Sequence, residues 1–165
     1  MENKFTIYLE TTIPSFLTAR PSGDLVIAGK QEVTRRWWEE RKNFYHIVIS
    51  AFVLDEAGSG DSQAAARRLE CLEEFELLEA DDVVDEITKA ILASGIIPPK
   101  AITDAAHIAI ASRHDVDFLM TWNCTHIANA EIIRKIEVIV RNCGYNMPII
   151  CTPDELFGGG TNDEN

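Results

Sequence analysis

The sequence predicts one α/β domain built on a mainly parallel sheet of four to five strands. Short apolar runs alternate along the chain with longer segments whose apolar residues recur at three- and four-residue steps. Strands separated by helices of about ten residues or more form β-α-β units, which place helices on both faces of a parallel sheet. The 165 residues fit one domain. We expect it over residues 1–157, followed by a flexible acidic tail over 158–165 that begins with three glycines.

Each expected element follows from its local pattern. The strands are the short β-rich runs at residues 5–9, 44–51, 76–79, 118–121 and 149–151. The helices show helical periodicity at residues 13–19, 25–42, 53–57, 62–75, 83–93, 102–114 and 130–142. Pro14 suits a first helical turn, and Gly95 follows a helix end. In the longest helix the spacing predicts one face, formed by Val26, Gly29, Val33 and Trp37.

Composition and charge limit the compartment and the partners. The chain has 15 Lys and Arg against 27 Asp and Glu, a net charge of -12, which repels phosphate backbones at long range. It contains no apolar run near the about 18 residues of a membrane span and no recognisable signal peptide. The four cysteines form no C-x-x-C pair, and Cys124 with His126 has no visible second half of a zinc site. We therefore expect a cytoplasmic protein with reduced thiols and no membrane contact.

Acidic and amide side chains follow the predicted strands, at the edge where ligands bind in parallel sheets. Glu10 comes directly after the first strand, and Asp55 and Glu56 come one helical turn after the second. Asp104 opens the helix before the fourth strand, and Asn123 follows that strand. Clustered carboxylates repel each other unless a cation lies between them. Oxygen ligands suit Mg²⁺ or Mn²⁺, and such an ion can generate a hydroxide nucleophile beside a phosphodiester.

Each of these residues also has a structural interpretation. Glu10 would be a solvated residue at the end of a strand. Asp104 would favour a helix N-terminus, where negative charge is stabilised. Asn123 and His126 would be loop caps, and His107 is more typical of a packed helix histidine than of a metal ligand. The joint placement of the acidic residues, rather than any one of them, favours a site.

Four segments of the chain resemble the motifs of PIN domains, in the same order and over most of the length. They are residues 8–15 (YLETTIPS), 50–56 (SAFVLDE), 103–109 (TDAAHIA) and 121–129 (TWNCTHIAN). The layout is most similar to VapC-type toxins of bacterial toxin–antitoxin pairs. The resemblance implies a PIN-like three-layer α/β/α fold and a metal-dependent endoribonuclease that hydrolyses RNA. It also implies an antitoxin protein as a partner and a homodimer.

The resemblance assigns roles to four residues. Glu10, Glu56 and Asp104 would hold Mg²⁺ or Mn²⁺ and orient the attacking water, and Asn123 would stand where the family has a further Asp. Two of these residues depart from the family pattern. Glu10 replaces the usual Asp and adds one methylene, while Asn123 keeps an oxygen and loses a charge.

A second interpretation is a PIN-fold binding module with weak or lost catalysis, which associates with a partner protein or RNA. Residues 35–38 (RRWW) place cations beside aromatic rings, an arrangement that can follow a phosphate backbone and stack bases. Alternatively, Trp37 lies in the core and Glu39 and Glu40 pair with the cations. An unrelated phosphate-binding enzyme is disfavoured, because no G-x-x-x-x-G-K or G-x-G-x-x-G motif occurs at a strand–helix junction.

Overall fold

The computed structural model describes residues 3–158. Within this range the strands are β1 (Thr6–Leu9), β2 (His46–Ser50), β3 (Glu76–Leu78), β4 (Phe118–Met120) and β5 (Ile149–Cys151). The α-helices are α1 (Thr12–Thr18), α2 (Leu25–Glu40), α3 (Ala51–Ala57), α4 (Ser62–Leu72), α5 (Asp82–Ala93), α6 (Ile102–Arg113) and α7 (Ala130–Asn142). The bounds differ from the predicted ones by at most three residues. The predicted tail lies outside the described residues except for Gly158.

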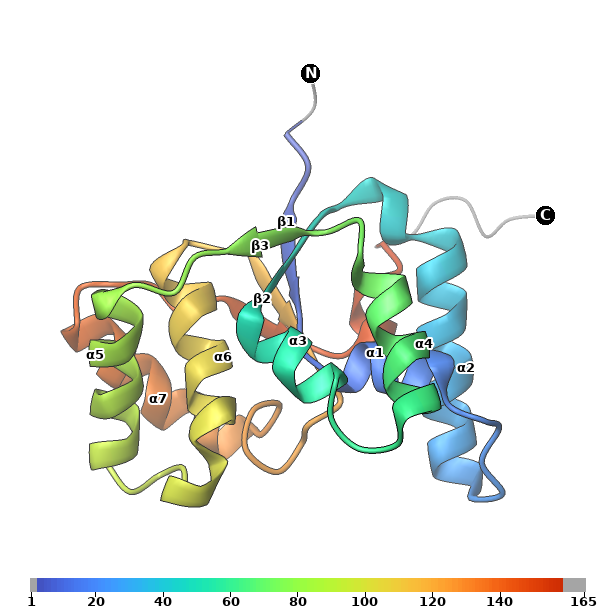
Figure 1. The fold of residues 1–165 in the computed structure, drawn as a ribbon. Helices are drawn as coiled ribbons and strands as arrows, with labels where there is room; N and C mark the ends of the chain where they lie inside the picture. Colours follow the sequence, from blue (N-terminus) through green and yellow to red (C-terminus); the bar gives the residue numbers. More distant parts are fainter. Residues whose placement is uncertain (1–2, 159–165) are drawn as a thin grey trace.

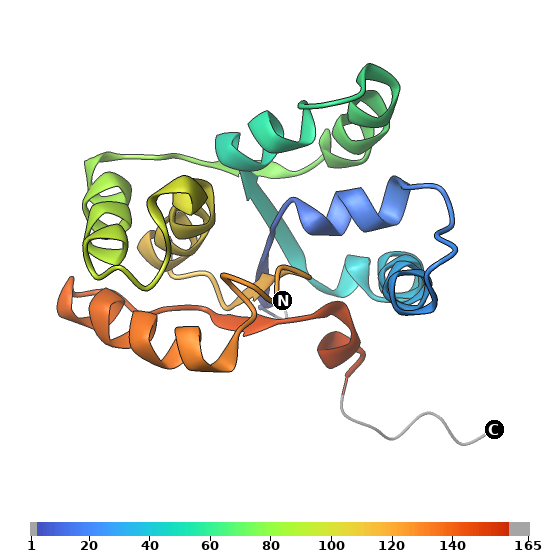
Figure 2. The same ribbon diagram turned by 90° about the horizontal axis from the view of Figure 1, so that it is seen from below.

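The strands form one sheet in the order β3-β2-β1-β4-β5, and every pair is parallel. Helices α5, α6 and α7 lie on one face, and α1, α2 and α4 lie on the other (Figures 1 and 2). The three-layer α/β/α arrangement with a parallel sheet is therefore confirmed. Because β1 is central, its carboxyl end lies between those of β2 and β4.

The core is formed where the helices cover the middle of the sheet. Ile7, Tyr8 and Leu9 of β1 are all buried, as expected for a strand with helices on both faces. On one side of the sheet, Trp37 of α2 is fully buried and stacks on Tyr45 with ring centroids 5.8 Å apart. Trp37 is thus the anchor that holds α2 to the sheet.

The face predicted for α2 is buried only in the second half of the helix. Leu25 and Val26 are 89% and 69% exposed, and Gly29 is exposed as well. The buried residues of this helix are Thr34 and Trp37. Figure 1 shows the first turns of α2 extending past α1, which leaves Leu25 and Val26 exposed. The apolar spacing defines a face but does not say how much of its length another element will cover.

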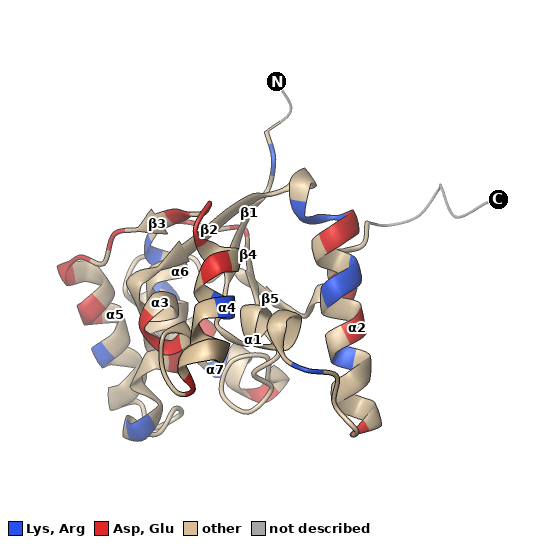
Figure 3. Cartoon of the chain, turned by 45° about the vertical axis from the view of Figure 1, so that its right-hand side comes forward, with Lys and Arg blue, Asp and Glu red and all other residues tan. Residues whose placement is uncertain are grey.

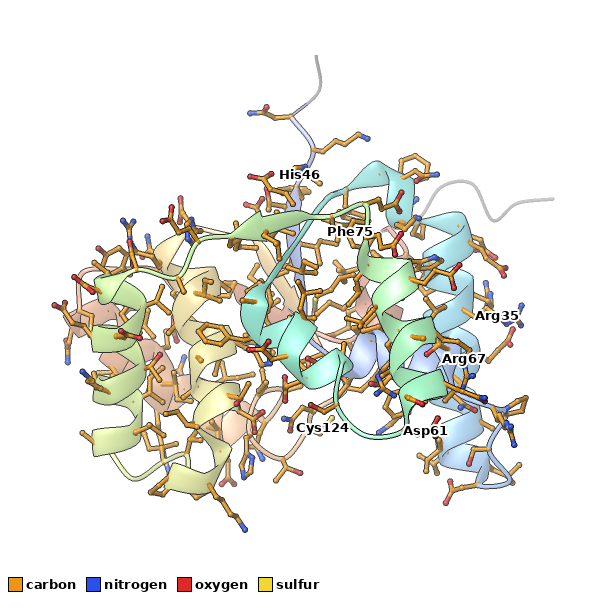
Figure 4. The ribbon with its side chains drawn as sticks, in the orientation of Figure 1. Arg35, His46, Asp61, Arg67, Phe75 and Cys124 are labelled. Carbon is orange, nitrogen blue, oxygen red and sulfur yellow. The ribbon has the colours of Figure 1, made fainter. Side chains whose placement is uncertain are left out.

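Two of the three cations of α2, Arg35 and Arg36, are paired with glutamates along the helix surface. Arg35 lies next to Glu32 and Glu39, and Arg36 lies 3.6 Å from Glu40. Figure 3 shows this alternation of charges along α2, and Arg35 projects away from the body of the molecule in Figure 4. The interpretation in which glutamates pair with the cations is therefore confirmed.

The neighbouring Trp38 is half-buried. Its ring packs edge-on against Phe75, and the Lys42 ammonium lies 4.7 Å from its centroid. Phe75 and Lys42 therefore cover part of the Trp38 ring, and less of it is free to stack on an RNA base. Among residues 3–158, no helix combines the length and the apolar character needed to cross a membrane.

Candidate functional site

The candidate site lies at the carboxyl edge of the sheet, the side that faces the viewer in Figure 2. Glu10 follows β1 directly, and its backbone N–H donates to the carbonyl of Met120 at the end of β4. Glu56 lies in α3, the short helix that begins immediately after β2. His107 lies in α6, which packs against α3. Three segments that are far apart in sequence therefore converge on one edge.

Glu10 is only 3% exposed, and one of its carboxylate oxygens is held by three donors. Its Oε2 accepts from the backbone N–H of Thr12 at 2.9 Å, the Thr12 hydroxyl at 2.5 Å and the Thr121 hydroxyl at 2.8 Å. Its Oε1 accepts no hydrogen bond from residues 3–158, and within that range Glu10 has no salt bridge. Burial raises the pKa of Glu10, although His107 and Thr12 act in the opposite direction. A buried carboxylate of this kind is stabilised by either a proton or a metal cation.

Glu56 is half-buried, and hydrogen bonds hold one of its two carboxylate oxygens. Its Oε1 accepts from the hydroxyl of Thr11 at 2.7 Å and from Nε2 of His107 at 2.5 Å. Burial opposes ionisation of Glu56. The hydrogen bond from His107 and its charge, together with the hydrogen bond from Thr11, outweigh this effect and hold the pKa of Glu56 below its usual value. Its Oε2 accepts no hydrogen bond within the described part of the chain. Each of the two carboxylates thus has one oxygen available to a ligand.

His107 is fully buried, as predicted for a packed helix histidine. The packing nevertheless places it at the site, since its Nδ1 lies 2.7 Å from the Tyr8 hydroxyl while its Nε2 contacts Glu56. The sequence contained one signal for this role. Asp104 and His107 are three residues apart on a helix and therefore share a face.

The side-chain ligand atoms at this edge can be compared with those that a divalent metal ion prefers. Ligand atoms of Glu10, Glu56 and His107 all lie within 4.8 Å of one another, the one such group of three or more among residues 3–158. Two carboxylates with free oxygens are suitable ligands for a hard divalent ion such as Mg²⁺ or Mn²⁺. Burial of Glu10 raises its pKa in spite of its hydrogen bonds, and a cation nearby would stabilise the ionised carboxylate. The two carboxylates therefore fit the ion that the sequence predicts.

Asp104 lies outside this group and contacts another histidine. Its Oδ2 is 2.8 Å from Nδ1 of His126, and its side chain is 16% exposed. Asn123 holds the same loop, because its Oδ1 accepts from the backbone N–H groups of Thr125 and His126. The loop-cap interpretation of Asn123 is thus confirmed. The roles of Asp104 and Asn123 in catalysis remain predictions.

Cys124 lies in the loop after β4. Cys124 is exposed, and Figure 4 shows it at the side of the molecule where the strands end. It belongs to no metal-ligand group in the described part of the chain. His126 instead contacts Asp104.

Comparisons with known proteins now identify the fold. No protein-family model matches the sequence, and no curated protein matches it. Among solved structures, the chain is similar to VapBC2 from Rickettsia felis bound to a DNA fragment from its promoter, with 15% identity and a TM-score of 0.52 over 90% of this chain and 98% of that one. It is also similar to FitAcB from Neisseria gonorrhoeae, with 16% identity and a TM-score of 0.53 over 91% and 99% of the two chains. In both toxin–antitoxin complexes the toxin subunit is a PIN domain. The chain has a PIN-like fold.

Within this PIN-like fold, the structure shows how the additional methylene of Glu10 is accommodated. The longer side chain places its carboxylate against Thr12 and Thr121, so that the carboxylate is anchored by residues that follow β1 and β4. The charge lost at Asn123 is accompanied by a structural role in the loop. Glu10 and Asn123, the two residues that differ from the family pattern, are thus both held by hydrogen bonds in this fold.

Glu10→Gln is expected to raise the free energy of unfolding of the metal-free protein at neutral pH. An amide oxygen can accept the bonds that Oε2 accepts, and the buried charge is removed. Because folding raises the pKa of Glu10, the folded chain binds this proton more tightly than the unfolded chain does. The resulting stabilisation is complete below the unfolded pKa and is lost as the pH rises through the folded pKa.

Urea unfolding of both proteins from about pH 4 to about pH 8 tests this expectation. The stability of the wild type relative to Glu10→Gln should fall as the pH rises. A difference that stays constant across this range would contradict the raised pKa.

Proposed function

We propose that this protein is a divalent-metal-dependent endoribonuclease of the PIN toxin type, neutralised in the cell by an antitoxin protein. The observation that carries the proposal is the pair of carboxylates, Glu10 and Glu56, each anchored by one oxygen and free at the other. The pair lies at the carboxyl edge of a PIN-like sheet. The similarity to two toxin–antitoxin complexes supports an antitoxin as the partner.

The residues of the site divide into those that would bind the ion and those that orient them. Glu10 and Glu56 would hold Mg²⁺ or Mn²⁺, which when bound neutralises phosphate charge and makes a bound water more acidic. Thr12 and Thr121 orient Glu10. Thr11 orients Glu56 together with His107. Because both carboxylates are held in place before substrate arrives, the site has little reorganisation to undergo at that step.

We place Asp104 beside the same site, where its side chain is 16% exposed. Its Oδ1 accepts no hydrogen bond within the described residues, so this oxygen is available to the ion or to the attacking water. His126 holds the other oxygen. Asn123 supports the arrangement by capping the loop that carries His126. In this proposal Asn123 contributes to the site through the shape of the loop.

Cleavage of a labelled RNA panel tests the proposed function. Cleavage is expected with Mn²⁺ or Mg²⁺, and EDTA should abolish it, because two carboxylates without an ion repel the phosphate. Adding excess Mn²⁺ after EDTA should restore cleavage. Activity that persists in EDTA would contradict the proposed mechanism, because in it Glu10 and Glu56 act through the ion that they hold.

A binding module without catalysis is the second candidate function. The Asn123 side chain favours it, because it carries no charge and its Oδ1 is used to cap a loop. Under this alternative, no RNA would be cleaved with any metal, while a stable complex with a partner protein would still form.

Light scattering on the purified chain would test the proposed homodimer. A role against cellular RNA would require the cytoplasmic location that we expect.

A further inference from the structure

A chain of hydrogen bonds runs from the centre of the sheet to the candidate site. The Ser50 hydroxyl lies 2.7 Å from the Tyr8 hydroxyl, which lies 2.7 Å from Nδ1 of His107. Nε2 of His107 lies 2.5 Å from Oε1 of Glu56. Ser50, Tyr8 and His107 are fully buried, and Glu56 alone reaches the surface. The four residues come from β2, β1, α6 and α3, so the chain connects separate elements.

The direction of the last bond follows from the chemistry of its acceptor. An ionised carboxylate can only accept, so Nε2 of His107 donates to Glu56. With a neutral ring, Nδ1 accepts from Tyr8, and Tyr8 accepts from Ser50. With a protonated ring, these two bonds reverse while Nε2 still donates to Glu56. In both states each ring nitrogen already has a partner, and neither is free to bind a metal ion.

We propose that His107 is a positioning residue that acts through Glu56 and is not itself a metal ligand. It holds Oε1 in place, so that Oε2 remains available to a divalent cation. This inference rests on the proposed function. It assigns to the buried histidine the orienting contact that metal-binding carboxylates commonly receive from neighbouring groups.

Glu56 needs such a contact because of where it lies. Its helix, α3, has only seven residues, and its side chain is half-buried with several rotatable bonds. Fixing a flexible carboxylate before the ion arrives reduces the entropy lost on binding. Thr11 supplies one anchor from the loop after β1, and His107 supplies the other from α6.

The affinity for Mn²⁺ alone, measured by calorimetry on the full chain, tests the proposal. His107→Leu removes the donor and is expected to weaken Mn²⁺ binding about 10-fold or more. His107→Gln retains an N–H donor near the Nε2 position and should recover much of that affinity. Tyr8→Phe removes only the outer bond, should weaken binding less than His107→Leu, and serves as the second variant if His107→Leu does not fold. Ser112→Ala, at another buried polar residue of α6, is the matched control and should leave Mn²⁺ binding unchanged.

Electron spin echo spectroscopy of bound Mn²⁺ separates a positioning role from direct ligation. A nitrogen coupling that is present in the wild type and absent in His107→Gln would overturn the proposal. Equal Mn²⁺ affinity of His107→Leu and the wild type would also overturn it. If the wild type itself bound no Mn²⁺, the proposed function would fail first, and the role of His107 would fail with it. Affinity lost in His107→Leu and recovered in His107→Gln, without such a coupling, is the supporting result.

Discussion

Glu56→Gln is expected to lower kcat/KM for metal-dependent RNA cleavage by about 100-fold or more. The amide oxygen can accept from Thr11 and His107 as Oε1 does, so the local structure should be kept. The change replaces the free carboxylate oxygen with an NH₂ group, which cannot bind a cation. Initial rates measured over a range of Mn²⁺ concentrations will show the loss.

Asp55→Asn is the control for this experiment. Asp55 is the neighbouring acid in α3, is exposed, and its side chain makes no hydrogen bond or salt bridge within residues 3–158. This variant carries the same charge change and should retain nearly full activity. Equal rates for Glu56→Gln and Asp55→Asn would remove Glu56 from the site. A loss in both would instead indicate a general effect of net charge.

Trp37→Ala is expected to lower the free energy of unfolding by about 3–5 kcal/mol. Trp37 is fully buried, stacks on Tyr45 and anchors the only well-covered part of α2. Removing the indole leaves a cavity that α2 cannot close without moving. Because small domains have a stability of only about 5–15 kcal/mol, this variant should lie close to unfolding. Urea denaturation at low temperature measures the change.

Trp38→Ala tests whether the effect belongs to the buried position. Trp38 is half-buried against Phe75, so its removal should cost clearly less than that of Trp37. A larger loss for Trp38→Ala would show that α2 is held mainly by its other side. Trp37→Phe is the milder variant if Trp37→Ala cannot be purified.

The sequence was sufficient to predict the secondary structure, because local periodicity and turn residues mark each segment. The strand at residues 149–151 and the helix at 130–142 were predicted with the same bounds that the structure has. The face of α2 could not be predicted in the same way. Val26 has the spacing of a core residue but is 69% exposed.

The candidate site was partly predictable for a similar reason. Parallel strands bring their carboxyl ends to one edge of the sheet, so Glu10 and Glu56 could be placed at the same edge from the sequence. Whether each oxygen is free or already bonded could not be inferred. The contact between Asp104 and His126 depends on the path of the loop after β4, and the sequence pattern does not define that path.

The sequence by itself determined the succession of strands and helices, the parallel sheet that follows from it and the acidic residues at its carboxyl edge. Only the tertiary structure decided that His107 joins Tyr8 to Glu56, residues that lie 99 and 51 positions away from it in the chain. The physical reason is that periodicity reports on neighbours within a segment. A hydrogen bond between buried groups depends instead on how whole helices and strands are placed against one another.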